Sequence, residues 1–184
     1  MLKSGKNDLE LMDADFNKFN RFIKTVDRYR TYVAPKRTNK LKVALFVGKP
    51  GTGKTKMAYD LFPDLYANPI GKDLWFDGYA GQPHVLIDDF SGQMRLVDLL
   101  RFLDVYPIKV PRKGGFVWWL PDFIIVTTNV HPKDWYKYED RTDSAVALRR
   151  RFTTVFDFDA KITTPGANFG DPAERPVNNY WIIQ

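Results

Sequence analysis

The stretch LKVALFVGKPGTGKT, residues 41–55, decides the fold of this 184-residue chain. Its first half is an almost continuous apolar run, typical of a strand that other elements cover on both faces. Its second half matches G-x-x-x-x-G-K-[ST] at every fixed position, and a helix-forming segment follows. Glycines allow successive backbone N–H groups to turn inward, and the next helix adds the positive end of its dipole. The sequence therefore predicts a strand, a phosphate-binding loop and a helix.

Each position of this loop has a predicted task. Lys54 would place its charge beside the β- and γ-phosphates of a nucleotide such as ATP, and Thr55 would offer its hydroxyl to Mg²⁺. The remaining phosphate-binding positions are Gly48, Pro50, Gly51, Thr52 and Gly53. A glycine turn with only a structural purpose is the alternative, but the strand before the loop and the helix after it favour the nucleotide site.

A second apolar run, at 84–88, ends in the acids Asp88 and Asp89. An acid at the end of a neighbouring buried strand can reach the metal ion of a phosphate-binding loop. We expect Asp88 to hold Mg²⁺ through its water shell, and Asp89 to orient or deprotonate the attacking water. A strand that simply ends in a solvated acidic turn is the alternative interpretation.

A third run, at 123–127, leads to Asn129. The side chain of Asn129 could donate a hydrogen bond to the γ-phosphate or to the attacking water, and so detect whether the γ-phosphate is present. Asparagine is also common in turns that end strands, and that alternative stays open.

Strand and helix signals alternate along residues 41–158. Helices are expected after Lys54, at 96–103 and at 144–151, so we predict an α/β domain with a mostly parallel central sheet. Residues 1–40 have apolar positions three or four apart, which predicts a small helical segment, either packed on the main domain or serving as a collar between subunits. Residues 159–184 are rich in Pro, Gly and Asn and are expected to lack regular structure.

The run YPIKVPRKGGFVWWL, residues 106–120, predicts a β-hairpin with a basic turn. Lys109, Arg112 and Lys113 lie in or near this turn, and no acid occurs among these residues. They are the candidate contacts to the phosphates of a nucleic acid, although a solvated basic turn is the alternative. The aromatic residues that follow could stack on bases, but for Trp118 and Trp119 core packing is the favoured use.

Composition narrows the choices further. The chain has no cysteine, which excludes disulfides and thiolate metal sites, and its net charge of +6 favours a polyanionic partner. No uninterrupted apolar run approaches the roughly 18 residues of a membrane span, so we expect no membrane partner. His84 and His131 are 47 residues apart (131 − 84), and neither is expected to bind a metal.

Three strand ends, GKPGTGKT, VLIDDF and IIVTTN, occur in an order and spacing that resemble a superfamily 3 helicase. The longer segments LWFDGYAGQPHVLIDDFSG, DLLRFLDVYPIKVPRKGGF and FIIVTTNVHPKDWY look like the helicase domain of the replication initiator (Rep) of circoviruses and related small circular single-stranded DNA viruses. The resemblance covers about residues 41–158. It implies an AAA+-like fold, a hexameric ring and ATP-driven 3′→5′ movement on single-stranded DNA during rolling-circle replication, with the host nucleus as the expected location.

The same resemblance assigns further residues. Members of the family carry an arginine finger, which acts on a neighbouring subunit's nucleotide, near the position of ALRRRF, residues 147–152. Arg151 is the favoured candidate and Arg150 the second, while a basic helix end or a generic DNA contact is the alternative. Lys113 matches a hairpin lysine that grips DNA phosphate. The His-hydrophobic-His motif of the family's nicking domain is absent, so we expect a helicase-only fragment or a protein that has lost the nickase.

Two other functions fit parts of the pattern. A small P-loop kinase would share the loop and could use the arginines as a lid, but the paired acids suit water activation and the basic hairpin has no purpose there. A non-catalytic DNA-binding module would need no intact Lys54, Thr55, Asp88 and Asp89. The sequence therefore favours the DNA-translocating ATPase.

Overall fold

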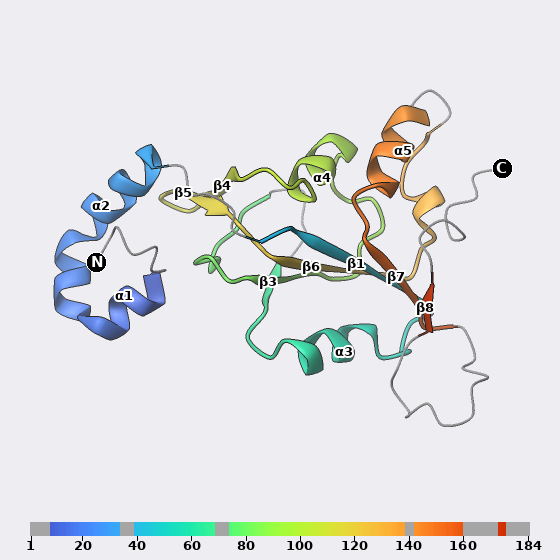
Figure 1. The fold of residues 1–184 in the computed structure, drawn as a ribbon, viewed down its shortest axis with the longest axis horizontal. Coiled ribbons are helices and arrows are strands. Elements are labelled where there is room, and N and C mark those ends of the chain that lie inside the picture. Colours follow the sequence, from blue (N-terminus) through green and yellow to red (C-terminus); the bar gives the residue numbers. More distant parts are fainter. Residues whose placement is uncertain (1–7, 34–38, 69–73, 139–141, 160–172, 176–184) are drawn as a thin grey trace.

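The computed structural model describes residues 8–33, 39–68, 74–138, 142–159 and 173–175. In this part of the chain a six-stranded sheet forms the centre, with the strand order β2-β3-β6-β1-β7-β8 (Figure 1). Neighbouring strands are parallel except for β7 and β8. The strands are β1 (Lys42–Val47), β2 (Tyr66–Asn68), β3 (His84–Ile87), β6 (Phe123–Thr128), β7 (Thr154–Asp157) and β8 (Ala173–Arg175). The predicted α/β fold with a mostly parallel sheet is confirmed.

The sheet is covered on both faces, as the continuous apolar runs predict. Side chains of β1 alternate between two clusters, because successive residues of a strand point to opposite faces. Val43 and Leu45 face the larger cluster, together with α4 (Leu96–Phe102) and α5 (Thr142–Arg149), whereas Ala44 and Phe46 face the smaller one with α3 (Lys54–Leu61). Figure 1 shows α3 on one side of the sheet and α4 and α5 on the other.

The basic segment forms the predicted hairpin, made of β4 (Ile108–Arg112) and β5 (Gly115–Trp119). Trp119 joins it to the core: its side chain is 1% exposed, and its indole N–H donates to the Phe102 carbonyl over 2.9 Å at the end of α4. Its ring also packs edge-on against Phe76, with ring centroids 5.0 Å apart. Core packing is thus confirmed for Trp119. Trp118 is half-buried, and its ring lies 5.0 Å from the Lys109 ammonium.

The N-terminal segment is helical, as expected, but it forms two helices where one amphipathic helix was the simplest expectation. The helices α1 (Asp8–Ala14) and α2 (Phe16–Tyr32) meet at Asp15. The Asp15 carboxylate accepts from the Lys18 N–H over 2.9 Å and so caps α2. Leu11, Phe19 and Val26 form a small core of their own between these helices. A collar between subunits stays a prediction.

The tail provides a correction. Residues 159–184 were expected to lack regular structure, but Ala173–Arg175 form β8, which pairs antiparallel with β7. The unpaired edge of β7 explains the pairing, because an edge strand offers free N–H and C=O groups to any extended segment nearby. Most of the predicted tail lies outside the described residues. In the part of the chain that the structure describes, no helix has the length and apolar character needed to cross a membrane.

The Trp119 contact yields a prediction about stability. Trp119→Phe removes the N–H that satisfies the Phe102 carbonyl at the end of α4, and it leaves a gap in the core. We expect the free energy of unfolding to fall by about 2 kcal/mol. Urea denaturation followed by circular dichroism measures this change. Trp75→Phe is the matched control, since that side chain is 47% exposed and should change stability little. Equal effects of the two substitutions would contradict the anchoring role of Trp119.

Candidate functional site

The predicted site residues of the three strand ends meet at one edge of the sheet. Strands β3, β6 and β1 are neighbours, and they are parallel, so their carboxyl ends lie side by side. The loop after β1 is the predicted phosphate loop, the acids follow β3, and Asn129 follows β6. The fold thereby brings Lys54, Thr55, Asp88, Asp89 and Asn129 together.

The loop has the backbone that the glycines predict. Gly51 has φ +79° and Gly53 has φ +90°, in the region that favours glycine, and Gly53 caps the N-terminus of α3. Gly48 is needed for a different reason: a Cβ added there would lie 2.8 Å from the Cβ of Phe158. The first glycine therefore allows close packing against the segment after β7, and the others shape the turn into α3.

Lys54 is the most constrained side chain of the loop. It is 5% exposed, and its ammonium donates to the carbonyls of Gly48 (2.7 Å) and Lys49 (2.8 Å) and to the Asn129 side-chain oxygen (2.7 Å). Burial lowers the pKa of Lys54, and the carboxylates of Asp89, Asp159 and Asp88 oppose this shift. The ammonium thus lies among acceptors at the mouth of the loop, where an incoming anion would compete for it.

Asp88 joins the loop to the two neighbouring strands. One of its oxygens, Oδ1, accepts from the Thr55 hydroxyl over 2.8 Å and from the Thr127 hydroxyl over 2.7 Å. Thr127 is fully buried on β6. Two oxygens that a divalent cation could use, from Thr55 and Asp88, therefore lie in hydrogen-bond contact. Sequence reasoning missed Thr127, although its place on a buried strand two residues before Asn129 is a signal that could have found it.

Asp89 has an unusual backbone. Its φ is +48°, the only positive value of a non-glycine residue in the described part of the chain. Its N–H donates to the Thr127 hydroxyl over 2.8 Å, which fixes the turn, and its Oδ1 accepts from the Asn129 amide over 3.2 Å. A continuous chain of hydrogen bonds therefore runs from Lys54 through Asn129 to Asp89.

A further acid reaches the loop from β7. Asp159 accepts the Lys49 N–H with both carboxylate oxygens, at 3.0 and 3.1 Å. Its own N–H donates to Asp157 over 3.0 Å. Sequence reasoning missed this residue, and only its place just after a strand of the same sheet could have pointed to it. Asp159 holds the first turn of the phosphate loop in position.

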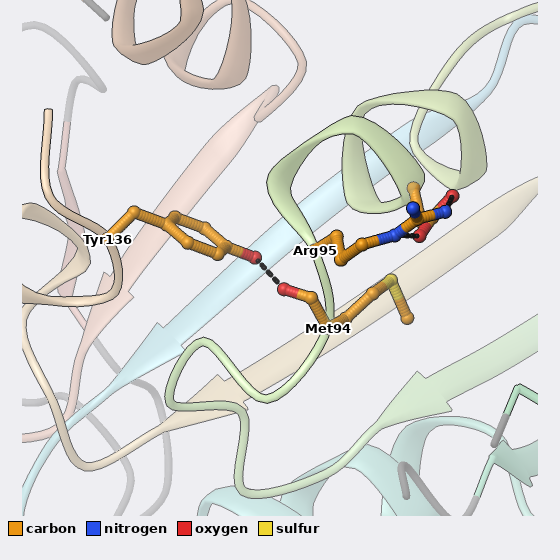
Figure 2. A network of polar contacts seen from close by, with 4 residues as sticks. Met94, Arg95 and Tyr136 are labelled. Carbon is orange, nitrogen blue, oxygen red and sulfur yellow. Dashed lines mark hydrogen bonds and ion pairs between the residues drawn. The ribbon is translucent and has the colours of Figure 1, made fainter. Parts of the chain in front are cut away.

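The segments that follow the acids and Asn129 are also joined to each other. Figure 2 shows Tyr136 reaching across to the main-chain carbonyl of Met94, just before α4, and its hydroxyl donates there over 2.8 Å. Burial raises the pKa of the Tyr136 hydroxyl, so it stays a neutral donor. Nearby, a Cβ added to Gly92 would lie 2.2 Å from the Trp135 carbonyl. The loop after β3 and the loop after β6 therefore cannot move far independently of each other.

The candidate arginines differ sharply in their surroundings. Arg151 donates to the carbonyls of Leu100 (2.7 Å) and Ala147 (2.9 Å) and forms a 2.6 Å ion pair with Asp104. The bond to Leu100 and the ion pair tie the end of α5 to α4 and to the residues just after it. Arg150 has an exposed side chain. The finger role of either residue stays a prediction, but the contacts of Arg151 give it a structural task within its own subunit.

The predicted DNA contacts do not join the phosphate loop. Lys109, Arg112 and Lys113 lie on the β4–β5 hairpin, which forms a separate two-stranded sheet. Lys113 is 82% exposed, and its ammonium lies 3.6 Å from the carboxylate of Asp77. Their contact with a nucleic acid stays a prediction. The structure places Asp77 against the turn of this hairpin.

This chain is similar in sequence to known viral replication proteins. The family model described as RNA helicase matches residues 44–130. The replication-associated protein of goose circovirus is 43% identical over 102 residues, which is 54% of this chain and 34% of that protein. The replication-associated protein of Human associated cyclovirus 1 is 37% identical over 142 residues, 73% of this chain and 48% of that protein. The replication-associated protein of Porcine circovirus 2 is 42% identical over 123 residues, which is 65% of this chain and 38% of that protein. The chain therefore spans between a third and a half of the length of these relatives.

The two arginines offer a matched pair of substitutions. Arg151→Ala removes the ion pair with Asp104, the bond to the Leu100 carbonyl of α4 and the bond to the Ala147 carbonyl of α5, and it leaves Asp104 without this partner. We expect the free energy of unfolding to fall by roughly 1–3 kcal/mol. Arg150→Ala changes an exposed side chain and should shift the free energy of unfolding by less than about 0.5 kcal/mol. Urea denaturation of both variants measures the difference. An Arg151→Ala protein as stable as the parent would show that these contacts contribute little.

Proposed function

Because this chain carries a helicase-like domain related to that of the circovirus replication-associated proteins, we propose that it is an ATP-driven translocase on single-stranded DNA. It would act in rolling-circle replication of a small circular single-stranded DNA genome, in the host nucleus. The observation that carries the proposal is the hydrogen-bonded network from Lys54 and Thr55 to Asp88, Asp89 and Asn129 at one edge of the sheet.

The residues present fit Mg²⁺-ATP. The N–H groups of the glycine loop and the N-terminus of α3 suit the phosphates, and Lys54 adds a positive charge beside them. In the described part of the chain, no three histidine or acidic side chains gather as a metal site. Thr55 and Asp88 nevertheless suit Mg²⁺, because this ion commonly takes one or two protein oxygens and completes its shell with water and phosphate. Bound Mg²⁺-ATP would supply the hydrolysable phosphoanhydride and a cation that neutralises developing charge.

The network also suggests how the site responds to its nucleotide. A γ-phosphate would compete with Asn129 for the Lys54 ammonium, since both are oxygen acceptors. The released Asn129 amide would then be available to the phosphate or to the attacking water. Asp89, which now accepts from Asn129 over 3.2 Å, would be available to orient that water and take its proton. Asn129 would thereby sense the γ-phosphate.

A ring of identical subunits would complete the site. Charge on the transferring phosphate can be stabilised by an arginine from a neighbouring subunit, an effect worth about 10³ to 10⁵ in rate in other phosphoryl-transfer enzymes. Arg150 suits this role better than Arg151, because it is exposed on its own subunit whereas Arg151 is held by Leu100, Ala147 and Asp104. A hexameric ring is part of the proposal.

A short physical path joins the site to the hairpin. The loop after Asp89 leads into α4, and the carbonyl of Phe102 near the end of α4 accepts from Trp119 on β5. Tyr136 fixes the start of this path by its bond to Met94. Movement of Asn129 and Asp89 on nucleotide exchange would therefore tilt α4 and, with it, the hairpin that carries Lys109, Arg112 and Lys113. In this proposal the tilt moves the DNA.

Phosphate release is the direct test of the proposed activity. We expect single-stranded DNA to stimulate ATP hydrolysis by the protein, and Lys54→Ala to lower the stimulated rate by roughly 100-fold or more, as loss of a preorganised charge does elsewhere. The matched control is Lys56→Ala, two residues along the same helix, whose side chain is 77% exposed and pairs with Asp60. That control should keep its rate. Hydrolysis that survives Lys54→Ala, or that needs a small-molecule acceptor in place of DNA, would contradict the proposal.

A further inference from the structure

Asp77 lies at the outer corner of a tight turn. The Tyr79 N–H donates to the Phe76 carbonyl over 3.1 Å, and Gly78 has φ +82°, as a turn with glycine at its third position requires. Phe76 and Tyr79, at the two ends of the turn, are each 1% exposed and pack in the main core. The core therefore fixes the turn, and Asp77 projects from a rigid base.

Two more bonds fix this turn, one from the hairpin and one from β2 of the central sheet. The Phe76 N–H donates to the Pro111 carbonyl of β4 over 2.9 Å, and the Tyr66 hydroxyl donates to the Asp77 carbonyl over 3.1 Å. The main chain of Asp77 is therefore held from both sides. Its side chain is 42% exposed and faces the hairpin turn at Lys113.

The Asp77 carboxylate makes two contacts of different character with Lys113. Its Oδ1 accepts the Lys113 backbone N–H over 2.7 Å, which fixes the position of the hairpin turn. Its Oδ2 lies 3.6 Å from the Lys113 ammonium, and the Lys113 side chain is 82% exposed. An exposed ion pair at that distance is weak and easily exchanged. The backbone bond is structural, whereas the ammonium is free to leave Asp77 for another anion.

We propose that Asp77 is a positioning residue that also takes the place of a DNA phosphate at Lys113 when no DNA is bound. This inference rests on the proposed function, in which Lys113 grips the strand. A phosphate oxygen replaces Oδ2 at the ammonium, while the bond from the Lys113 N–H to Oδ1 holds the turn in the same position. The fixed negative charge beside the site opposes phosphate binding and weakens it.

Weak binding of a DNA phosphate by Lys113 suits a hairpin that moves along the strand. A subunit that steps along a strand must release one phosphate before it takes the next, and a carboxylate that recaptures the ammonium favours that release. The Lys109 ammonium, also on the hairpin, lies over the ring of Trp118. Asp77 meets Lys113 at the tip of the hairpin, where a stepping strand would be gripped and released.

Asp77→Asn separates the two contacts. Asparagine keeps an oxygen for the Lys113 N–H but loses the charge, so the turn should stay in place while the competitor disappears. We expect the dissociation constant for a fluorescent oligothymidylate, measured by anisotropy without nucleotide, to fall about threefold at low salt, the size typical of one exposed ion pair. The gain should shrink as salt rises, because salt screens exposed charges. Unchanged or weaker binding would overturn the inference.

Two controls make the result specific. Asp60→Asn removes the same negative charge as Asp77→Asn, but on α3, on the other face of the sheet. It should leave the binding of DNA almost unchanged. In a Lys113→Ala background, Asp77→Asn should lose most of its effect, because the ammonium on which it acts is gone. A full gain in that background would also overturn the inference. If Lys113→Ala alone leaves binding unchanged, the hairpin's role in the proposed function fails; if it weakens binding and Asp77→Asn does nothing, only the role of Asp77 fails.

Discussion

The Lys54 ammonium is the constraint on which the rest of the site depends. A buried cation needs acceptors, and here the loop's own carbonyls at Gly48 and Lys49 supply two, with Asn129 as the third. Desolvation lowers the pKa of Lys54 despite three nearby acids, so the position favours an additional anion. These contacts hold the loop in a form that already points the Lys54 charge at the place where a phosphate would bind. A nucleotide phosphate then needs only to replace Asn129 as an acceptor of the Lys54 ammonium, and the loop does not have to be rebuilt.

The strand order connects Lys54 by hydrogen bonds to the residues at the ends of the neighbouring strands. Because β6 lies between β1 and β3, Asn129 can touch both Lys54 and Asp89, and Thr127 can bond to Asp88 and to the Asp89 N–H. The same two loops continue into Met94 and Tyr136, which are bonded to each other at the start of α4. Trp119 then links α4 to the hairpin. Each of these links is a single short hydrogen bond, and most of them involve buried or half-buried groups, although the bond between Asn129 and Asp89 is exposed.

Much of this arrangement could be predicted from the sequence. The apolar runs ending in the glycine loop, in Asp88 and in Asn129 predicted three adjacent strand ends, and the structure has them. Contacts between residues far apart in the chain could not be predicted. Asp159 reaches Lys49, Asp77 reaches Lys113 and Asp104 reaches Arg151, and none of these acids belongs to a local pattern. The break at Asp15 and the pairing of β8 were also missed, because capping and edge pairing compete with periodicity at costs of about 1 kcal/mol, which a pattern does not reveal.

The most direct measurement is a crystal structure of the protein with Mg²⁺ and a non-hydrolysable ATP analogue. We expect the Lys54 ammonium to move from Asn129 to the β- and γ-phosphate oxygens and the Thr55 hydroxyl to turn from Asp88 to the metal. The loop before α4 should shift together with Tyr136. A structure in which the analogue binds in the loop while the bond between Lys54 and Asn129 stays intact would contradict this expectation. So would an analogue bound away from the loop.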